Sequence, residues 1–195
     1  MNTPNKLTVA RMVISPILMA TLLIRTLPYR FTISLVLFIL GSITDYIDGH
    51  LARKYHIVTN FGKFLDPLSD KMLTTTAFIG MMAAGIGETL IGWSVILFIT
   101  LFREFLIASL RLVTVSSGGK VVAANWWGKT KTVLQMVSII VGLAGAAFAE
   151  FFTLPALYDV LMIVTAVLLW AGAVLCAVSG AVYVIDCKSF IDPRK

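Results

Sequence analysis

Charged residues are scarce in this chain of 195 residues, since only 13% are aspartate, glutamate, lysine or arginine. A soluble domain has about a quarter of its residues charged and about half apolar. Here 58% of the residues are hydrophobic. The shortage of charge therefore argues against a soluble globular domain and favours a membrane protein.

Cysteine and histidine are also scarce, with two of each. Cys176 and Cys187 lack the spacing of metal ligands or of a redox pair, so we expect both to be inert. His50 and His56 are expected at the surface and do not make a metal-ligand set. The chain also lacks low-complexity segments, long linkers and clear internal repeats. One domain over residues 1–195 is the simplest organisation.

Long apolar runs cover most of the chain. A membrane-spanning helix needs about 20 mostly apolar residues. The pattern predicts such helices at residues 8–27, 31–50, 66–86, 89–112, 130–150 and 157–184. The expected fold class is an all-α integral membrane protein with six transmembrane helices.

Positive charge is distributed unevenly between the two sides that six spans define. Of the 16 lysines and arginines, only Arg25 and Arg30 fall in the loops opposite the termini. Excess lysine and arginine marks the cytoplasmic side. We therefore expect a multi-pass protein of the cell membrane with both termini and residues 45–70 in the cytoplasm. A basic face near anionic membrane lipids explains the formal charge of +6, so no nucleic-acid partner is required.

Four of the ten acidic residues lie in one short segment, as Asp45, Asp48, Asp66 and Asp70. Spacings of three and four place each pair on one helix face, so two adjacent helix ends are expected to direct four carboxylates to one point. Charge at membrane depth is costly and usually functional. Hard oxygen ligands favour Mg²⁺, Mn²⁺ or Ca²⁺, and two such ions form the clamp used in phosphoryl displacement. The alternative is a set of helix caps and salt bridges.

The residues around the aspartates suit a phosphorylated ligand. Gly49 and Ala52 are small and would let a bulky group approach the backbone, while Arg53 could meet phosphate oxygens as a planar fork. Gly62 is expected before the third span, where it would permit a turn. Pro67 is expected in the first turn of that span, where proline is tolerated.

These residues form a longer pattern: D-x-x-D-G-x-x-A-R, eight residues, then G-x-x-x-D-x-x-x-D. The pattern resembles the signature of the CDP-alcohol phosphotransferases, and every fixed position is filled. The resemblance implies six spans, two metal ions (Mg²⁺ or Mn²⁺), a homodimer, and transfer from a CDP ester to an alcohol with CMP leaving. It makes Asp45, Asp48 and Asp66 metal ligands, and Asp70 the fourth ligand or the general base. The residues it places at the CDP site are Gly49, Ala52, Arg53 and Gly62.

Other stretches bear on the acceptor alcohol. The opening "PNKLTVAR" resembles the phosphatidylglycerophosphate synthases of this family, which would bring Asn5, Thr8 and Arg11 to the nucleotide or its phosphates. Thr8 could instead cap the first helix. The pattern R-E-F…L-R…G-K-x-K-T-x-x-Q, from residue 103 to 135, resembles the same branch. Arg111, Lys129 and Lys131 would then bind the phosphate of an acceptor such as glycerol 3-phosphate, although cations here also suit positive-inside anchoring.

The expected reaction joins CDP-diacylglycerol and glycerol 3-phosphate, with Asp70 as the base. Three alternatives remain open: a sister enzyme using inositol phosphate, serine or phosphatidylglycerol; a small cation transporter, since carboxylates also mark ion paths; and a purely structural subunit. For Arg103 and Glu104 the choice is between a buried ion-pair network and a polar floor under the acceptor.

Overall fold

The computed structural model describes residues 3–54, 60–87, 92–116 and 126–188. This part of the chain is helical, without strands. The helices are α1 (Thr3–Leu23), α2 (Arg30–Lys54), α3 (Asn60–Ala83), α5 (Trp93–Ser116), α6 (Trp126–Phe151) and α7 (Pro155–Asp186). Each contains one of the six apolar runs, or most of it, so the predicted all-α fold is confirmed.

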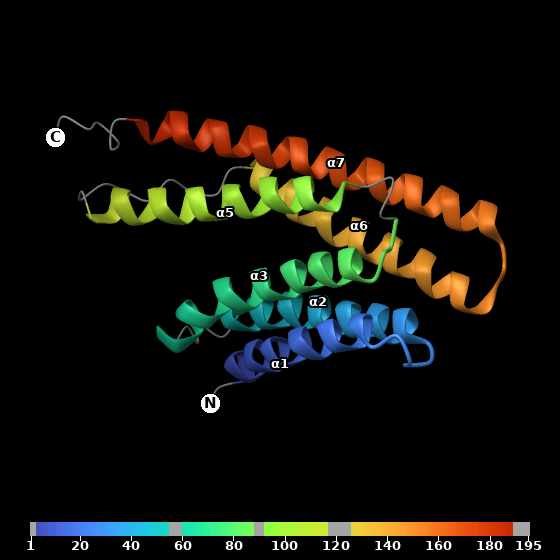
Figure 1. The fold of residues 1–195 in the computed structure, drawn as a ribbon. Coiled ribbons are helices and arrows are strands. Elements are labelled where there is room, and N and C mark those ends of the chain that lie inside the picture. The colour runs from blue at the N-terminus through green and yellow to red at the C-terminus, as the bar shows by residue number, and fades with distance from the viewer. Residues whose placement is uncertain (1–2, 55–59, 88–91, 117–125, 189–195) are drawn as a thin grey trace.

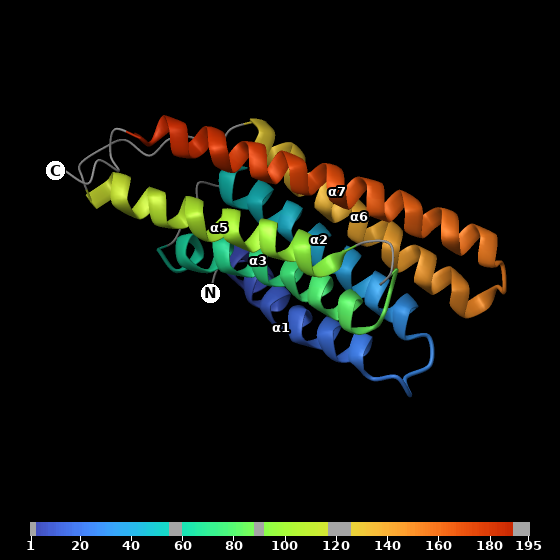
Figure 2. The ribbon, with the colours of Figure 1, turned by 45° about the horizontal axis from the view of Figure 1, so that its top comes forward.

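The helices pack as two groups (Figure 1). In the first group α1 packs on both α2 and α3, and in the second α7 packs on both α5 and α6. Helices α6 and α7 run side by side in both views (Figure 2). Packing of α2 on α6 joins the groups, and α1 begins at the same end of the bundle at which α7 finishes (Figure 1).

Polarity is inverted relative to a soluble protein. Large apolar side chains lie outside, including Phe98, Phe105 and Leu112, which are 67%, 69% and 72% exposed. Polar side chains such as Arg11 and Lys131 are buried instead. Because a soluble monomer rarely exposes such extensive apolar surface, this arrangement supports a lipid environment around the bundle.

Three of the described helices are long and apolar enough to cross a membrane by length and composition: Asn5–Leu23 within α1, Thr130–Phe151 within α6, and α7. The other three, α2, α3 and α5, carry the aspartates and the Arg103–Glu104 pair. The structure therefore places the charge-bearing helices together with strongly apolar ones in a single bundle.

Most helix boundaries differ from the predicted spans by several residues. Helix α3 begins at Asn60, six residues before the predicted start at 66, and α2 continues to Lys54. The prediction followed apolar runs, whereas helical hydrogen bonds continue into polar segments wherever the backbone permits. Gly62 therefore lies inside α3, not in a preceding turn, and Pro67 lies beyond its first turn; both expectations were wrong.

Glycines in α6 allow close contact between helices. A Cβ on Gly145 would lie 2.8 Å from Met162 Cε and 3.1 Å from Leu161 Cβ, while one on Gly142 would lie 2.6 Å from Met81 Cε. Small residues permit backbones to approach in this way. The stretch 142–149 thus serves packing within the chain.

Candidate active site

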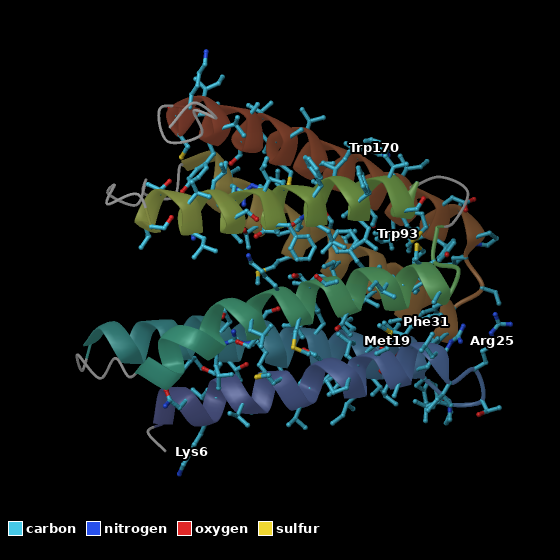
Figure 3. The ribbon with its side chains drawn as sticks, turned by 60° about the vertical axis from the view of Figure 1, so that its left-hand side comes forward. Lys6, Met19, Arg25, Phe31, Trp93 and Trp170 are labelled. Carbon is cyan, nitrogen blue, oxygen red and sulfur yellow. The ribbon has the colours of Figure 1, made fainter. Side chains whose placement is uncertain are left out.

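Helix α1 presents a buried polar face to its neighbours. Asn5, Thr8, Arg11 and Ser15 are all buried and recur at helical spacing. Thr8 cannot cap the helix, because α1 begins at Thr3, so that alternative was wrong. The face lies at the end of the bundle marked by Lys6, opposite the end marked by Arg25 (Figure 3).

Arg11 connects the two helices that carry the aspartates. Its side chain is fully buried, and its Nη1 forms an ion pair with Oδ1 of Asp45 on α2. The same Nη1 donates a hydrogen bond to Oγ of Ser69 on α3, at 3.1 Å. Ser69 lies between Asp66 and Asp70 in sequence. One guanidinium thus holds the two aspartate-bearing segments side by side.

The aspartates lie within their helices rather than at the tips. Asp45 and Asp48 precede the end of α2 by nine and six residues, and Asp66 and Asp70 follow the start of α3 by six and ten. The expectation of two helix ends is thus corrected, because both helices extend beyond their apolar runs. The side chains of several predicted site residues lie outside the described part of the structure: Asp48, Gly49, Ala52, Arg53, Asp66, Asp70 and Lys129.

The described part of the site suits a divalent cation. Asp45 is 35% exposed, and Arg11 holds its Oδ1. Carboxylate oxygens are ligands that hard divalent cations prefer. Among residues with described side chains, no group of three or more carboxylates, histidines or cysteines could hold a metal ion. The other three aspartates lie outside that set. The donor chemistry of Asp45 and its fixed orientation therefore fit a metal ligand.

A second polar cluster joins α3, α5 and α6. Glu104 on α5 forms ion pairs with Lys131 on α6 and with its neighbour Arg103, the latter at 3.1 Å. Its other oxygen, Oε2, pairs with Lys71 on α3 at 2.7 Å. Gln135 on α6 donates a hydrogen bond to Thr100 on α5 at 2.9 Å. This is the ion-pair network expected for Arg103 and Glu104.

The cluster borders a cavity of about 410 Å³ between the two helix groups. Its walls come from residues 68–76 of α3, 100–108 of α5 and 131–135 of α6, and Glu104, Lys71 and Lys131 all line it. The remaining lining is largely apolar or threonine. The structure therefore confirms the ion-pair network, and it places Glu104 at the wall of a cavity.

Two of the three predicted acceptor residues, Lys131 and Arg111, have described side chains, and these lie in different environments. Lys131 is buried and lines the cavity. Arg111 is exposed on α5, seven residues beyond Glu104 and therefore about 10 Å along the axis, and does not line the cavity. The CDP-site candidates Asn5 and Gly62 are both buried, on α1 and α3.

Sequence reasoning missed the partners of two cations. Arg11 was expected to contact the nucleotide, and its pairing with Asp45 was not predicted. Its helical spacing with Asn5, Thr8 and Ser15 could have indicated that it faces a neighbouring helix. Lys71 was counted only as a cytoplasmic cation, yet it spans from α3 to Glu104 on α5. Its position directly after Asp70 was the only hint.

Several known proteins are similar to this chain over 71% to 97% of its length. Residues 1–182 match the CDP-alcohol phosphatidyltransferase family. A CDP-diacylglycerol–glycerol-3-phosphate 3-phosphatidyltransferase of Bacillus subtilis is 41% identical over 149 residues, covering 71% of this chain and 74% of the relative. The protein of that name from Rickettsia bellii is 34% identical over 97% of both chains. A "Probable phosphatidylglycerophosphate synthase" of Mycobacterium tuberculosis is 35% identical over 94% of this chain and 80% of the relative.

Proposed function

Because the chain belongs to the CDP-alcohol phosphatidyltransferase family, we propose that it transfers the phosphatidyl group of CDP-diacylglycerol to the sn-1 hydroxyl of glycerol 3-phosphate. The products are phosphatidylglycerophosphate and CMP. The names of the relatives support this acceptor. The observation that carries the proposal is Arg11, which joins the Asp45 segment of α2 to the Asp66–Asp70 segment of α3.

The aspartates take separate roles. Asp45, Asp48 and Asp66 would hold two divalent ions, Mg²⁺ or Mn²⁺, and these ions would supply positive charge to the diphosphate and to the CMP leaving oxygen. Asp70 would act as the general base that removes the proton of the attacking hydroxyl; the alternative role for it is that of the fourth metal ligand. The CDP group lies against Asn5, Thr8, Gly49, Ala52, Arg53 and Gly62.

The acceptor enters the cavity between α3, α5 and α6. Its phosphate needs cations beyond those that serve the diphosphate, and Lys131 already lines the wall. Arg111 and Lys129 provide further positive charge at the same end of these helices. An ammonium group has three donors, so the pairing of Lys131 with Glu104 leaves room for a second partner.

The proposed orientation of the protein in the membrane rests on the distribution of lysine and arginine between its two ends. All six helices cross the bilayer as one domain over residues 1–195, with the termini and the active site on the cytoplasmic face of the cell membrane. The common end of α1 and α7 supports this topology (Figure 1). The acyl chains of CDP-diacylglycerol remain among the membrane lipids, and the protein acts as a homodimer, as its resemblance to the family implies.

The test is release of CMP by the purified protein. With CDP-diacylglycerol and Mg²⁺, we expect release with glycerol 3-phosphate and not with serine, inositol phosphate or phosphatidylglycerol. Asp70→Asn is the matched control: it should abolish turnover while CDP-diacylglycerol still binds. Release with serine but not glycerol 3-phosphate would refute this acceptor, and normal turnover by Asp70→Asn would remove Asp70 from the base role.

A further inference from the structure

The two oxygens of Glu104 have different partners. Oε1 accepts hydrogen bonds from Nζ of Lys131 and from Nη1 of Arg103, the second at 3.1 Å. Oε2 pairs only with Nζ of Lys71, at 2.7 Å, among the described residues. Loss of Lys71 would therefore leave Glu104 with two cationic partners, so its charge would remain compensated.

The three cationic side chains also differ in how exposed they are and in how firmly their other contacts hold them. The side chain of Lys131 is 5% exposed and that of Arg103 is 14% exposed, whereas that of Lys71 is 46% exposed. Arg103 is held further, because its Nη2 donates a hydrogen bond to Ser179 on α7 at 2.8 Å. A Cβ on Gly128 or Gly180 would approach Arg103 to 3.1 or 3.2 Å, so both glycines make room for it. Of the three cations, Lys71 can therefore exchange its partner with the smallest loss of packing and hydrogen bonds.

The cluster carries an excess of positive charge. Lys71, Arg103 and Lys131 contribute three positive charges against the one negative charge of Glu104. Charges beside a largely apolar cavity are normally compensated, and a phosphate monoester carries a charge of about −1.5 to −2 at pH 7. The charge of the cluster therefore matches that of a phosphate monoester.

We infer that Lys71 leaves Oε2 of Glu104 and binds the phosphate of the acceptor when it enters the cavity. Glu104 holds the Lys71 ammonium at the cavity wall beforehand, while Lys131 and Arg103 remain on Oε1. Lys71 directly follows Asp70, so a phosphate bound there would sit close to the proposed base. This inference rests on the proposed function, because it concerns the acceptor of that reaction.

The experiment compares Lys71→Met with the wild type. We expect the KM for glycerol 3-phosphate to rise at least about tenfold, because a hydrogen bond to a charged group is lost. The KM for CDP-diacylglycerol and kcat at saturating acceptor should change less than about threefold, and Lys71→Arg should recover part of the acceptor affinity. Lys6→Met is the matched control, since it removes an exposed lysine at the same end of the bundle (Figure 3).

A second measurement does not depend on turnover. Inorganic phosphate should raise the Tm of the wild type and of Lys6→Met. Lys71→Met should need about tenfold more phosphate for the same rise in Tm. If the wild type releases CMP with glycerol 3-phosphate and Lys71→Met has the same KM for glycerol 3-phosphate, this inference would be overturned while the proposed function would stand. A wild type that releases no CMP with glycerol 3-phosphate would overturn the proposed function, and this inference with it.

Discussion

Arg11 illustrates how one residue organises the site. A fully buried guanidinium is expensive unless its donors are satisfied, and here Nη1 contacts both Asp45 and Ser69. The contacts of Nη1 with Asp45 and Ser69 link α2 to α3 through a rigid, planar group, whereas a lysine ammonium lies on a flexible stem. Arg11 is therefore a positioning residue for Asp45, since it fixes the direction of that carboxylate.

Replacing Arg11 with methionine tests this role. We expect Arg11→Met to lower kcat/KM about 10- to 100-fold, because loss of a hydrogen bond to a charged group costs about 1.5–3 kcal/mol. The Mg²⁺ concentration for half-maximal activity should also rise, and Arg11→Lys should recover part of both. CMP release at varied Mg²⁺ measures the effect. Arg25→Met, at an exposed arginine of the opposite end, is the control; wild-type Mg²⁺ dependence in Arg11→Met would contradict the role.

At the scale of single elements, the start of α2 depends on a distant helix. The carboxylate of Glu150, near the end of α6, accepts hydrogen bonds from the backbone N–H of Phe31 and Thr32, at 2.8 and 3.1 Å. It also accepts one from the Thr32 hydroxyl at 2.8 Å. The first N–H groups of a helix lack partners within the helix, so Glu150 caps α2 and joins the two helix groups.

Glu150→Ala should therefore destabilise the fold without changing the chemistry. We expect a loss of about 1–2 kcal/mol, the usual range for a helix cap. For a chain of this size that corresponds to a Tm lowered by about 2–8 °C, as thermal unfolding in detergent would measure. The KM for glycerol 3-phosphate should not change, because Glu150 lies at the end away from the cavity. Asp159→Ala, at an exposed acid in α7, is the control; an equal loss in both variants would argue against the cap.

At the scale of the whole molecule, a largely apolar cavity with one charged wall lies between the two helix groups, while large apolar side chains face outward. The cavity opens between α3 of one group and α5 and α6 of the other. Among the residues that the structure describes, Lys71 and Glu104 form an ion pair that joins α3 to α5. The charged wall formed by Lys71, Glu104 and Lys131 therefore lies between the helix groups, whereas the most exposed side chains are apolar.

Topology can be tested by labelling single cysteines with a membrane-impermeant maleimide. In right-side-out vesicles, Arg25→Cys should label directly, whereas Lys6→Cys should label only after permeabilisation. The two positions mark opposite ends of the bundle (Figure 3). The wild type is the blank, because Cys176 and Cys187 are both buried. Direct labelling of Lys6→Cys but not Arg25→Cys would place the site on the outer face.

The sequence by itself determined the number and type of the described helices. It also determined that two aspartates lie in α2 and two in α3. Apolar runs and helical spacing are local properties, because each helical hydrogen bond joins residues only four apart. The helix ends were less accurate, since α3 begins well before its apolar run. The roles of Asp48, Asp66 and Asp70 stay predictions.

Only the tertiary structure decided which charges meet. Arg11 and Ser69 are 58 positions apart, Glu104 and Lys131 are 27 apart, and Glu150 lies 118 residues after Thr32. The sequence around Lys71 does not identify Glu104 as its partner, because that pairing is set by how α3 packs beside α5. Residues far apart in the sequence form pairs where helices pack against one another. Which residues pair therefore depends on the packing of all the helices in the bundle.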